Sequence, residues 1–252
     1  MGLYEELVWV DLVEPIRPLL DRGELEWDSE KGKIVIPVKL RWNYPWVMGE
    51  VDGTRPCGLW LDFYFNIYKI FPKACQKCWK VVARPRTLKE LFGVMRMQKG
   101  YRIPGKCGVE NRAWTPGGVY GAYWYLPLGI GEEEAVGLKR EIEADLAREV
   151  AIGMPMVVKR GCTEIEHYFG PSPGWTQELF DRMAPKEALL DALFEFNVGK
   201  YRQPGALVSH IQRQWVERAW REGDPTVWEF AERESFPSTP VDYDKGGRVD
   251  EG

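Results

Sequence analysis

Residues 132–159 have the sequence EEEAVGLKREIEADLAREVAIGMPMVVK, which predicts a long amphipathic helix over 132–150 followed by a short strand. Three acids stand at the start of the helix, where the helix dipole favours negative charge. Met156 to Lys159 predict a short buried strand that ends at Gly161-Cys162. Within the helix, apolar residues recur at spacings of three or four, as on the buried face of a packed helix: Ala135, Leu138, Ile142, Leu146 and Val150.

Regular patterns also precede this stretch. Residues 24–41 predict a hairpin with one buried face, because apolar residues recur with period two around a polar turn at 28–32. Pro37 cannot donate to a sheet ladder, so we expect the second arm at a sheet edge or at a bulge. Residues 57–71 are apolar nearly throughout and fit either a strand or a helix. Thr87 is expected to cap a helix that runs through Gln98.

The C-terminal part is predicted to be helical. Four helices are expected, over 175–183, 186–196, 206–221 and, more weakly, 226–234. The run at 170–174, Gly-Pro-Ser-Pro-Gly, can neither continue a helix nor pair in a sheet, so it is the expected boundary. Residues 236–252, rich in Pro, Ser, Asp and Gly, are expected to form a disordered tail. We therefore predict an α+β protein: a mixed or antiparallel sheet with a metal site in residues 1–169, and a helical subdomain over residues 175–235.

The composition is that of a globular protein, with 252 residues, 44% of them hydrophobic, and 12 Trp, 11 Tyr and 10 Phe. These aromatics supply enough apolar area for a core, which excludes wholesale disorder and a disulfide-dependent miniprotein. Acids precede the first basic residue, Arg17, which is the wrong charge order for a targeting signal, so a cytoplasmic protein is expected. The charge-free stretch 113–131 contains five Gly and two Pro. We expect strands and turns there, and no membrane partner.

The five cysteines indicate a metal site, because thiols in a reducing compartment are more often buried, metal-bound or catalytic than paired. Cys75-Gln-Lys-Cys78 is a CxxC pair, whose tight turn points both sulfurs to the same side. Cys107 and Cys162 are expected to complete the ligand set, because an adjacent glycine leaves room for metal and sulfur. Cys57, which also precedes a glycine, competes for this role. Cysteine ligation suits both zinc and a 4Fe-4S cluster, and the alternative is five buried thiols without a metal.

A basic segment surrounds the CxxC pair. Between Lys69 and Lys106 there are eleven basic residues and the single acid Glu90, a net charge of +10; because the whole chain is −4, the rest sums to −14. Basic residues follow a phosphate backbone, and aromatic residues among them stack on the bases. Exposed tyrosines in 117–125 could stack in the same way. The alternative is that the segment folds against the protein's own acids, such as those of 132–149. RNA or DNA is the expected partner, with contacts from Lys77, Trp79, Lys80, Arg84, Arg86, Lys89 and Arg96.

A second group of reactive side chains lies in Cys162-Thr-Glu-Ile-Glu-His167. If this segment is a strand, Glu164 and Glu166 share one face, and His167 is a candidate general base or fourth metal ligand. This grouping favours a metal-dependent enzyme of the hydrolase type, whereas the alternative is a polar surface turn. The sequence has no GxxxxGK[ST] loop and no GxGxxG after a strand, which disfavours nucleotide hydrolysis and dinucleotide redox chemistry.

The sequence therefore favours a nucleic-acid-binding metalloprotein, in which the metal holds the basic loops in shape. Such a protein acts alone or as a subunit of a larger nucleoprotein assembly. The competing functions are an enzyme at the Cys162–His167 segment and a protein-interaction subunit that uses exposed Trp and Tyr. A nucleic-acid-binding protein would lose salt-sensitive affinity when Lys and Arg are neutralised, whereas an enzyme would lose turnover when a single carboxylate is removed.

Overall fold

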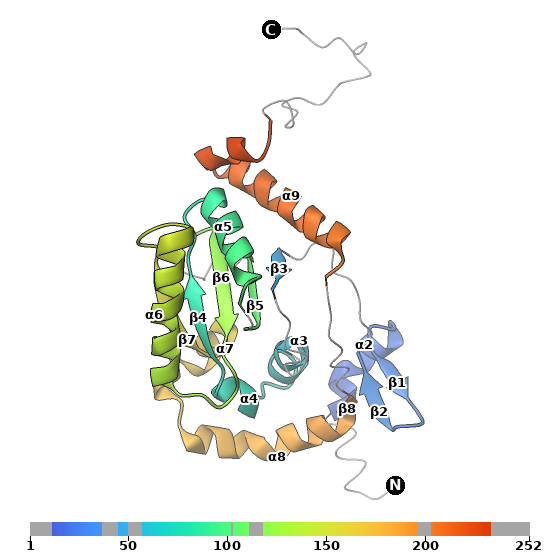
Figure 1. Ribbon diagram of the computed structural model, residues 1–252. Helices are drawn as coiled ribbons and strands as arrows, with labels where there is room; N and C mark the ends of the chain where they lie inside the picture. Colours follow the sequence, from blue (N-terminus) through green and yellow to red (C-terminus); the bar gives the residue numbers. More distant parts are fainter. Residues whose placement is uncertain are drawn as a thin grey trace, which may run out of the picture.

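The computed structural model describes residues 12–36, 45–49, 57–101, 103–110, 118–195 and 203–232. These residues form helices and two β-sheets, which confirms the α+β class (Figure 1). The larger sheet has the strand order β3-β5-β6-β4-β7 and is antiparallel throughout. The smaller sheet has the order β1-β2-β8 and is mixed, because β2 and β8 run parallel. Within the described ranges, no helix is both long and apolar enough to cross a membrane.

The strands of the larger sheet are β3 (Trp46–Met48), β4 (Trp79–Ala83), β5 (Gly105–Val109), β6 (Tyr120–Tyr125) and β7 (Met156–Arg160). Those of the smaller sheet are β1 (Glu26–Asp28), β2 (Lys33–Val35) and β8 (Phe194–Glu195). The described α-helices are α2 (Arg17–Asp21), α3 (Cys57–Leu59), α4 (Lys73–Gln76), α5 (Leu88–Gln98), α6 (Glu132–Glu149), α7 (Thr163–Phe169), α8 (Gln177–Leu193) and α9 (Gly205–Arg221). α3 continues into a π-helix, Trp60–Phe65, and short 3-10 helices cover Glu14–Ile16, Ser172–Gly174 and Pro225–Glu229.

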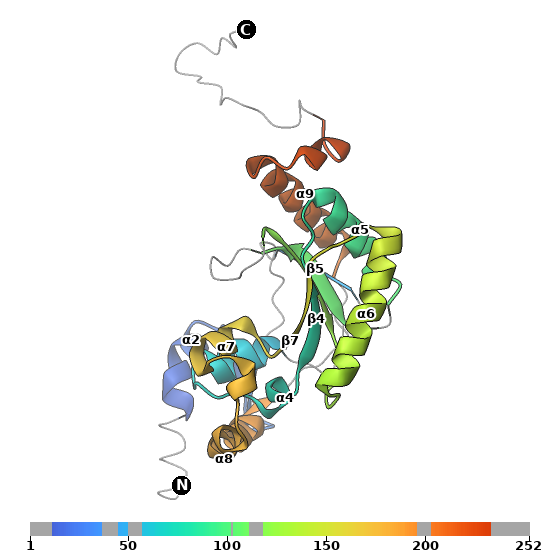
Figure 2. The same ribbon diagram turned by 90° about the vertical axis from the view of Figure 1, so that its left-hand side faces the viewer.

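The main layer is built from β4, α5, β5, β6, α6 and β7 in chain order, with β4 between β6 and β7. This is the split βαβ topology. Figure 2 shows α5 and α6 on the same side of the sheet and α7 on the other side. The largest core lies on the α5 and α6 side and also receives Leu207, Ile211 and Trp215 from α9. We call the opposite side of the sheet the second face.

Strand alternation divides the side chains of β4 between the two faces. Val81 and Ala83 enter the core under the helices, whereas Val82 packs on the second face with Trp46 and Tyr123. Lys80 lies two residues before Val82 in the strand and therefore also belongs to the second face. The second face thus combines aromatic and charged side chains.

The two helices that the sequence defined best are confirmed. The Thr87 hydroxyl accepts a hydrogen bond from the Glu90 backbone N–H at 3.2 Å and caps α5. α6 covers Glu132–Glu149 and buries Ala135, Ile142 and Leu146 as expected. The strand after it is also confirmed, but the expectation that it is buried is wrong. β7 forms an edge of the sheet, and Val157 is 55% exposed.

The N-terminal hairpin is confirmed by β1 and β2, which pair antiparallel and bury Leu25 and Ile34 around them. Pro37 and the rest of the expected second arm lie outside the described residues. The ambiguous stretch after Cys57 is helical, through α3 and the π-helix.

The C-terminal helices pack in different places. α8 is one helix with Pro185 inside it, where two helices were expected. Its Leu190 packs with Leu25 and Ile34 of the hairpin, whereas α9 packs on the core of the larger sheet. Figure 1 shows α8 and α9 at opposite ends of that sheet. The expected helical subdomain and its boundary are therefore not confirmed, and the predicted tail over 236–252 lies outside the described residues.

A close approach between α5 and α6 yields a stability prediction. A Cβ added at Gly93 would lie 2.7 Å from the Val150 side chain, whereas one at Gly137 in α6 would meet nothing within 4 Å. Replacing a helical glycine by alanine normally stabilises a helix by about 1 kcal/mol. We expect Gly137→Ala to raise the urea midpoint and Gly93→Ala to lower it. Val150→Ala should partly restore the Gly93→Ala variant, and an equal gain from both glycine replacements would contradict this packing.

Candidate metal centre and nucleic-acid interface

Cys75 lies in the short helix α4, and Cys78 follows it directly before β4. The Cys75 backbone N–H donates to the Pro72 carbonyl at 2.8 Å, and that of Cys78 donates to the Cys75 carbonyl at 3.3 Å. Both cysteines are buried. A strand, β4, follows the pair, and the short helix α4 precedes Cys78.

The end of β7 brings Cys162 to the same corner of the sheet. β4 and β7 pair antiparallel with Trp79 opposite Arg160, and the Gly161 N–H donates to the Cys78 carbonyl at 2.8 Å. Cys162 follows directly and occupies the N-cap position of α7, without a side-chain capping hydrogen bond. The Arg160 Nε atom donates to the Gln76 carbonyl at 2.6 Å, which ties the CxxC turn to β7.

Cys57 approaches this corner from α3. Trp60 and Leu61, three and four residues after it, pack against the apolar cluster that contains Cys75 and Cys162. Burial raises the pKa of the Cys75 thiol well above its ordinary value, and the charges of Cys162, Cys78 and Cys57 raise it further. Four of the five cysteines are therefore electrostatic neighbours.

Cys107 lies elsewhere. It pairs with Ala122 of β6, which pairs with Ala83 at the far end of β4 from Cys78. Its side chain is fully buried in the core under α5, where burial raises the pKa of the thiol. The structure does not bring Cys107 to the CxxC pair, although the sequence predicted it as a ligand.

The four neighbouring cysteines do not already form a coordination shell. Over the part of the chain that the structure describes, no three His, Cys, Asp or Glu side chains are arranged as a metal-binding group. The donor set at the corner consists of sulfur, which fits zinc or an iron–sulfur cluster and does not fit Mg²⁺ or Ca²⁺.

On the second face, three cations surround one tyrosine ring. Lys80, Arg84 and Lys106 lie 5.9, 5.8 and 5.2 Å from the centroid of the Tyr123 ring. Lys106 is also 4.4 Å from the centroid of Trp46, whose ring meets Tyr123 edge-on at 5.4 Å. We call these five residues the cation–aromatic cluster.

The Tyr123 hydroxyl links charges of both signs. It donates to Glu110 at 2.9 Å and accepts from Arg84 at 3.4 Å. Burial raises the pKa of Tyr123, the Arg84 charge lowers it and Glu110 raises it, so the phenol stays protonated and can donate. Trp46, Tyr123, Lys80 and Glu110 are buried, whereas Arg84, Lys106 and Tyr125 are half-buried. These last three side chains form the accessible rim.

Lys80 connects the rim to the cysteine corner. Burial lowers the pKa of its ammonium, but the charges of Cys162, Cys78, Tyr123 and Glu164 together raise it above the ordinary value. Its ammonium is also 5.9 Å from the Tyr125 ring. One buried cation therefore interacts with both parts of the candidate site.

The other predicted nucleic-acid contacts are spread over the molecule. Trp79 alternates with Lys80 and packs against the core under the helices, so its ring is not on the second face. Arg86 pairs with Glu90 at 2.7 Å, and Lys89 pairs with Glu229 at 2.9 Å. For these two cations the alternative applies, in which the basic segment folds against the protein's own acids. Lys77 and Arg96 are exposed.

The sequence interpretation missed Trp46, Lys106 and Glu110 as site residues. Trp46 lies in β3, which pairs with β5 from a distant part of the chain, and Glu110 directly follows β5. Alternation within each strand was the available signal. It places Lys80 and Arg84 on the face opposite Trp79, and Tyr123 and Tyr125 on the face opposite Trp124.

The proposed catalytic segment is helix α7 and not a strand, so the expectation that Glu164 and Glu166 share a face is wrong. Glu166 forms an ion pair with Lys159 of β7, and His167 is exposed. The run at 170–174 has the letters of a Gly-x-Ser-x-Gly elbow, but Ser172 begins a 3-10 turn between two helices. The elbow requires a strand-to-helix turn. The enzyme hypothesis stays a prediction.

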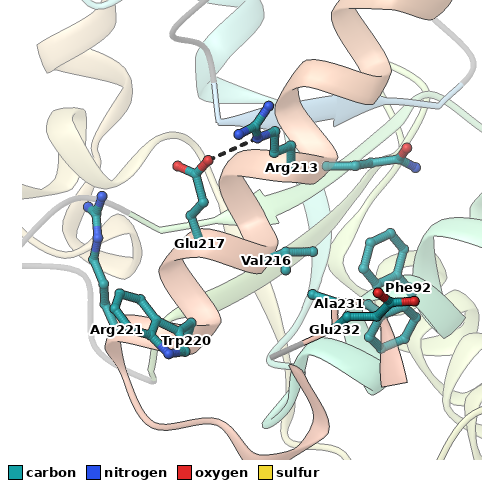
Figure 3. Close-up of a pocket in the computed structure, with 10 residues that line it drawn as sticks. Phe92, Arg213, Val216, Glu217, Trp220, Arg221, Ala231 and Glu232 are labelled. Atoms are coloured by element: carbon teal, nitrogen blue, oxygen red, sulfur yellow. Dashed lines mark hydrogen bonds and ion pairs between the residues drawn. The ribbon is translucent and has the colours of Figure 1, made fainter. Parts of the chain in front are cut away.

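A pocket of about 910 Å³ lies at the other end of the molecule, between α5, α9 and the residues after the last 3-10 helix. Figure 3 shows Phe92, Val216 and Trp220 along it, with an ion pair between Arg213 and Glu217 on one wall. The metal cysteines and the predicted nucleic-acid contacts do not line it.

The Tyr123 hydroxyl provides a test of the cluster. Tyr123→Phe removes the hydroxyl that donates to the buried Glu110 carboxylate and accepts from Arg84, so we expect it to reduce the free energy of unfolding by about 1–3 kcal/mol. Tyr168→Phe, at a ring that is 56% exposed, should change it by less than about 0.5 kcal/mol. Urea unfolding measures both. Equal stability of the two variants would show that the hydroxyl is not part of a buried network.

Comparisons with known proteins do not assign this site. No protein-family model, no curated protein and no solved structure matches the chain.

Proposed function

We propose that this protein is a nucleic-acid-binding metalloprotein that binds single-stranded RNA or DNA along the rim of the second face. The observation that carries the proposal is the convergence of Lys80, Arg84 and Lys106 on the Tyr123 ring. Two of these cations, Arg84 and Lys106, are half-buried at the rim, where a polyanion can reach them. Partial burial reduces the screening of their charge by water, which strengthens the attraction for a phosphate backbone.

The aromatic content of the face supports a single strand rather than a duplex. Tyr125 is half-buried and stands next to Tyr123 in a stacked arrangement with ring centroids 6.5 Å apart. Unpaired bases stack on such rings with little dependence on sequence. Four-stranded sheets that bind single-stranded RNA use aromatic side chains on the face that their helices leave open.

The metal half of the proposal concerns the corner where β4 and β7 meet. A metal held by Cys75, Cys78 and Cys162 would cross-link the CxxC turn to the end of β7, next to Lys80. Thiolates carry negative charge, which offsets part of the charge of Lys80 and so supports its burial. A structural metal contributes its binding free energy to folding. Its function here is to fix the position of the strand that carries Lys80 and Arg84.

The first test compares two pairs of cations from the basic segment. Arg84→Ala with Lys106→Ala removes two rim cations, so the slope of log affinity against log salt for a fluorescent oligo-dT or oligo-U should flatten by about 1.4, at roughly 0.7 per phosphate of a single strand. Arg86→Ala with Lys89→Ala removes two cations already paired with Glu90 and Glu229, and should leave the slope nearly unchanged. Fluorescence anisotropy over a salt series measures both.

If the slope flattens for the Arg86 and Lys89 variant and not for the Arg84 and Lys106 variant, the contacts lie at the start of α5. The second face would then not be the interface. Two unchanged slopes, or the absence of salt-sensitive binding by the wild-type chain, would reject nucleic-acid binding itself. Far-UV circular dichroism and the urea midpoint confirm that each variant is folded before its slope is compared.

The second test separates stacking from charge. Tyr125→Ala should weaken binding of the same oligonucleotides by about 1–3 kcal/mol, because one base loses its ring partner, and should leave the salt slope unchanged. Trp228→Ala replaces a ring that is 43% exposed on the last 3-10 helix, at the other end of the molecule, and serves as the control. Equal losses from the two variants would reject a stacking role for Tyr125.

A further inference from the structure

We propose that the metal centre is a site of four cysteine sulfurs, from Cys57, Cys75, Cys78 and Cys162, and that Cys57 completes it in place of Cys107. The inference rests on the metal half of the proposed function and names its full ligand set. It also sets the class of metal. Four sulfurs favour a thiophilic ion, either Zn²⁺ or the iron of a cluster, over hard cations.

Sheet register holds three of the cysteines together. Cys78 stands immediately before β4, and Cys162 stands one residue beyond the Gly161 that donates to the Cys78 carbonyl. Cys75 lies one turn before Cys78, and the Cys78 N–H donates to its carbonyl. The Arg160 side chain closes the same corner through the Gln76 carbonyl. The three backbones are therefore fixed next to one another by hydrogen bonds that do not involve the sulfurs.

The helical segment that begins at Cys57 leads to the same corner. Trp60 and Leu61 follow Cys57 by three and four residues. Both of these residues pack against the cluster formed by Cys75, Cys162 and neighbouring rings. Cys57 is the exposed member of the four, so in this site it is the ligand on the solvent side.

The same strand register excludes Cys107 as a ligand of this metal site. It lies opposite Ala122, which lies opposite Ala83, five residues along the chain from Cys78. At about 3.3 Å per residue this separation is about 16 Å along the strands, with two strand spacings to add across the sheet. A metal–sulfur bond is about 2.3 Å long, so one ion cannot reach both residues.

Metal binding draws the four sulfurs together, since the described residues hold no finished metal-binding group. Each thiol loses a proton as its sulfur binds. Four thiolates around Zn²⁺ leave a net charge of −2, and the buried Lys80 of β4 lies two residues after Cys78. The chain therefore places a positive charge where the filled site is negative.

The experiment replaces each cysteine by serine in the full chain, purified without oxygen. Metal and acid-labile sulfide per chain are measured by elemental and colorimetric analysis, with the visible absorption spectrum. Zinc without sulfide identifies a Zn²⁺ site, and iron with sulfide identifies a cluster. We expect Cys57→Ser, Cys75→Ser, Cys78→Ser and Cys162→Ser each to lower metal content to less than half and to lower the melting temperature. Cys107→Ser is the matched control and should retain full metal content.

A second measurement uses the wild-type chain and does not depend on the folding of variants. Iodoacetamide labelling followed by peptide mass spectrometry should find Cys57 protected in the metal-loaded protein, although its side chain is exposed in the fold. Removal of the metal by a chelator should make Cys57 the fastest cysteine to react. Protection that does not change with the chelator would overturn the assignment of Cys57.

The outcomes separate the two proposals. Full metal in Cys57→Ser, with loss in the other three variants, would overturn the four-cysteine site and leave the metal half of the proposed function standing. Loss in Cys107→Ser, with a wild-type melting temperature, would also overturn it. Full metal in all five variants, or no metal in the wild-type chain, would reject the metal half of the proposed function itself.

Discussion

The pairing of β4 with β6 on one side and β7 on the other fixes the position of most residues of the candidate site. Side chains alternate along a strand, so a slip of one residue would send Lys80 into the core and Val81 to the second face. Burial of Val81 and Ala83 under the helices prevents this slip. The same register places the start of β4 beside the end of β7, which is where Cys78 and Cys162 meet. Core packing on one side of the sheet thus sets the chemistry on the other.

The sequence predicted the elements whose signals are local. α5 has a capping threonine and α6 has a stripe of apolar residues, and both form as expected. Features that depend on distant partners were not predictable. Val157 and Val158 have the composition of a buried strand, yet β7 is an edge strand because the sheet has no further strand beyond it among the described residues. The division of the C-terminal helices between two cores is equally non-local, because it depends on what each helix contacts.

The same distinction applies to the candidate site. The CxxC pair is a local pattern, and the strand predicted directly after it forms as β4, whereas the short helix α4, which contains Cys75, was not predicted. The identity of its neighbours depends on register, which places Cys162 beside the pair and Cys107 five residues away along the sheet. The basic segment is continuous in sequence, but a strand and a helix distribute its charges over opposite sides of the sheet. Arg86 and Lys89 form ion pairs with Glu90 and Glu229, whereas Lys80 and Arg84 surround Tyr123.

The pairing of early strands with late ones determines the order in which the molecule can be assembled during its synthesis. Lys80 of β4 pairs with Lys159 of β7, which is made 79 residues later. At about 5–20 residues per second, a ribosome needs about 4–16 s to cover that distance. Cys75 and Cys78 are therefore synthesised seconds before Cys162. The delay is longer for Ile34 and its partner Phe194, which are further apart in the chain. The new chain must keep these thiols reduced and these apolar residues apart from other molecules until its C-terminal half has been made.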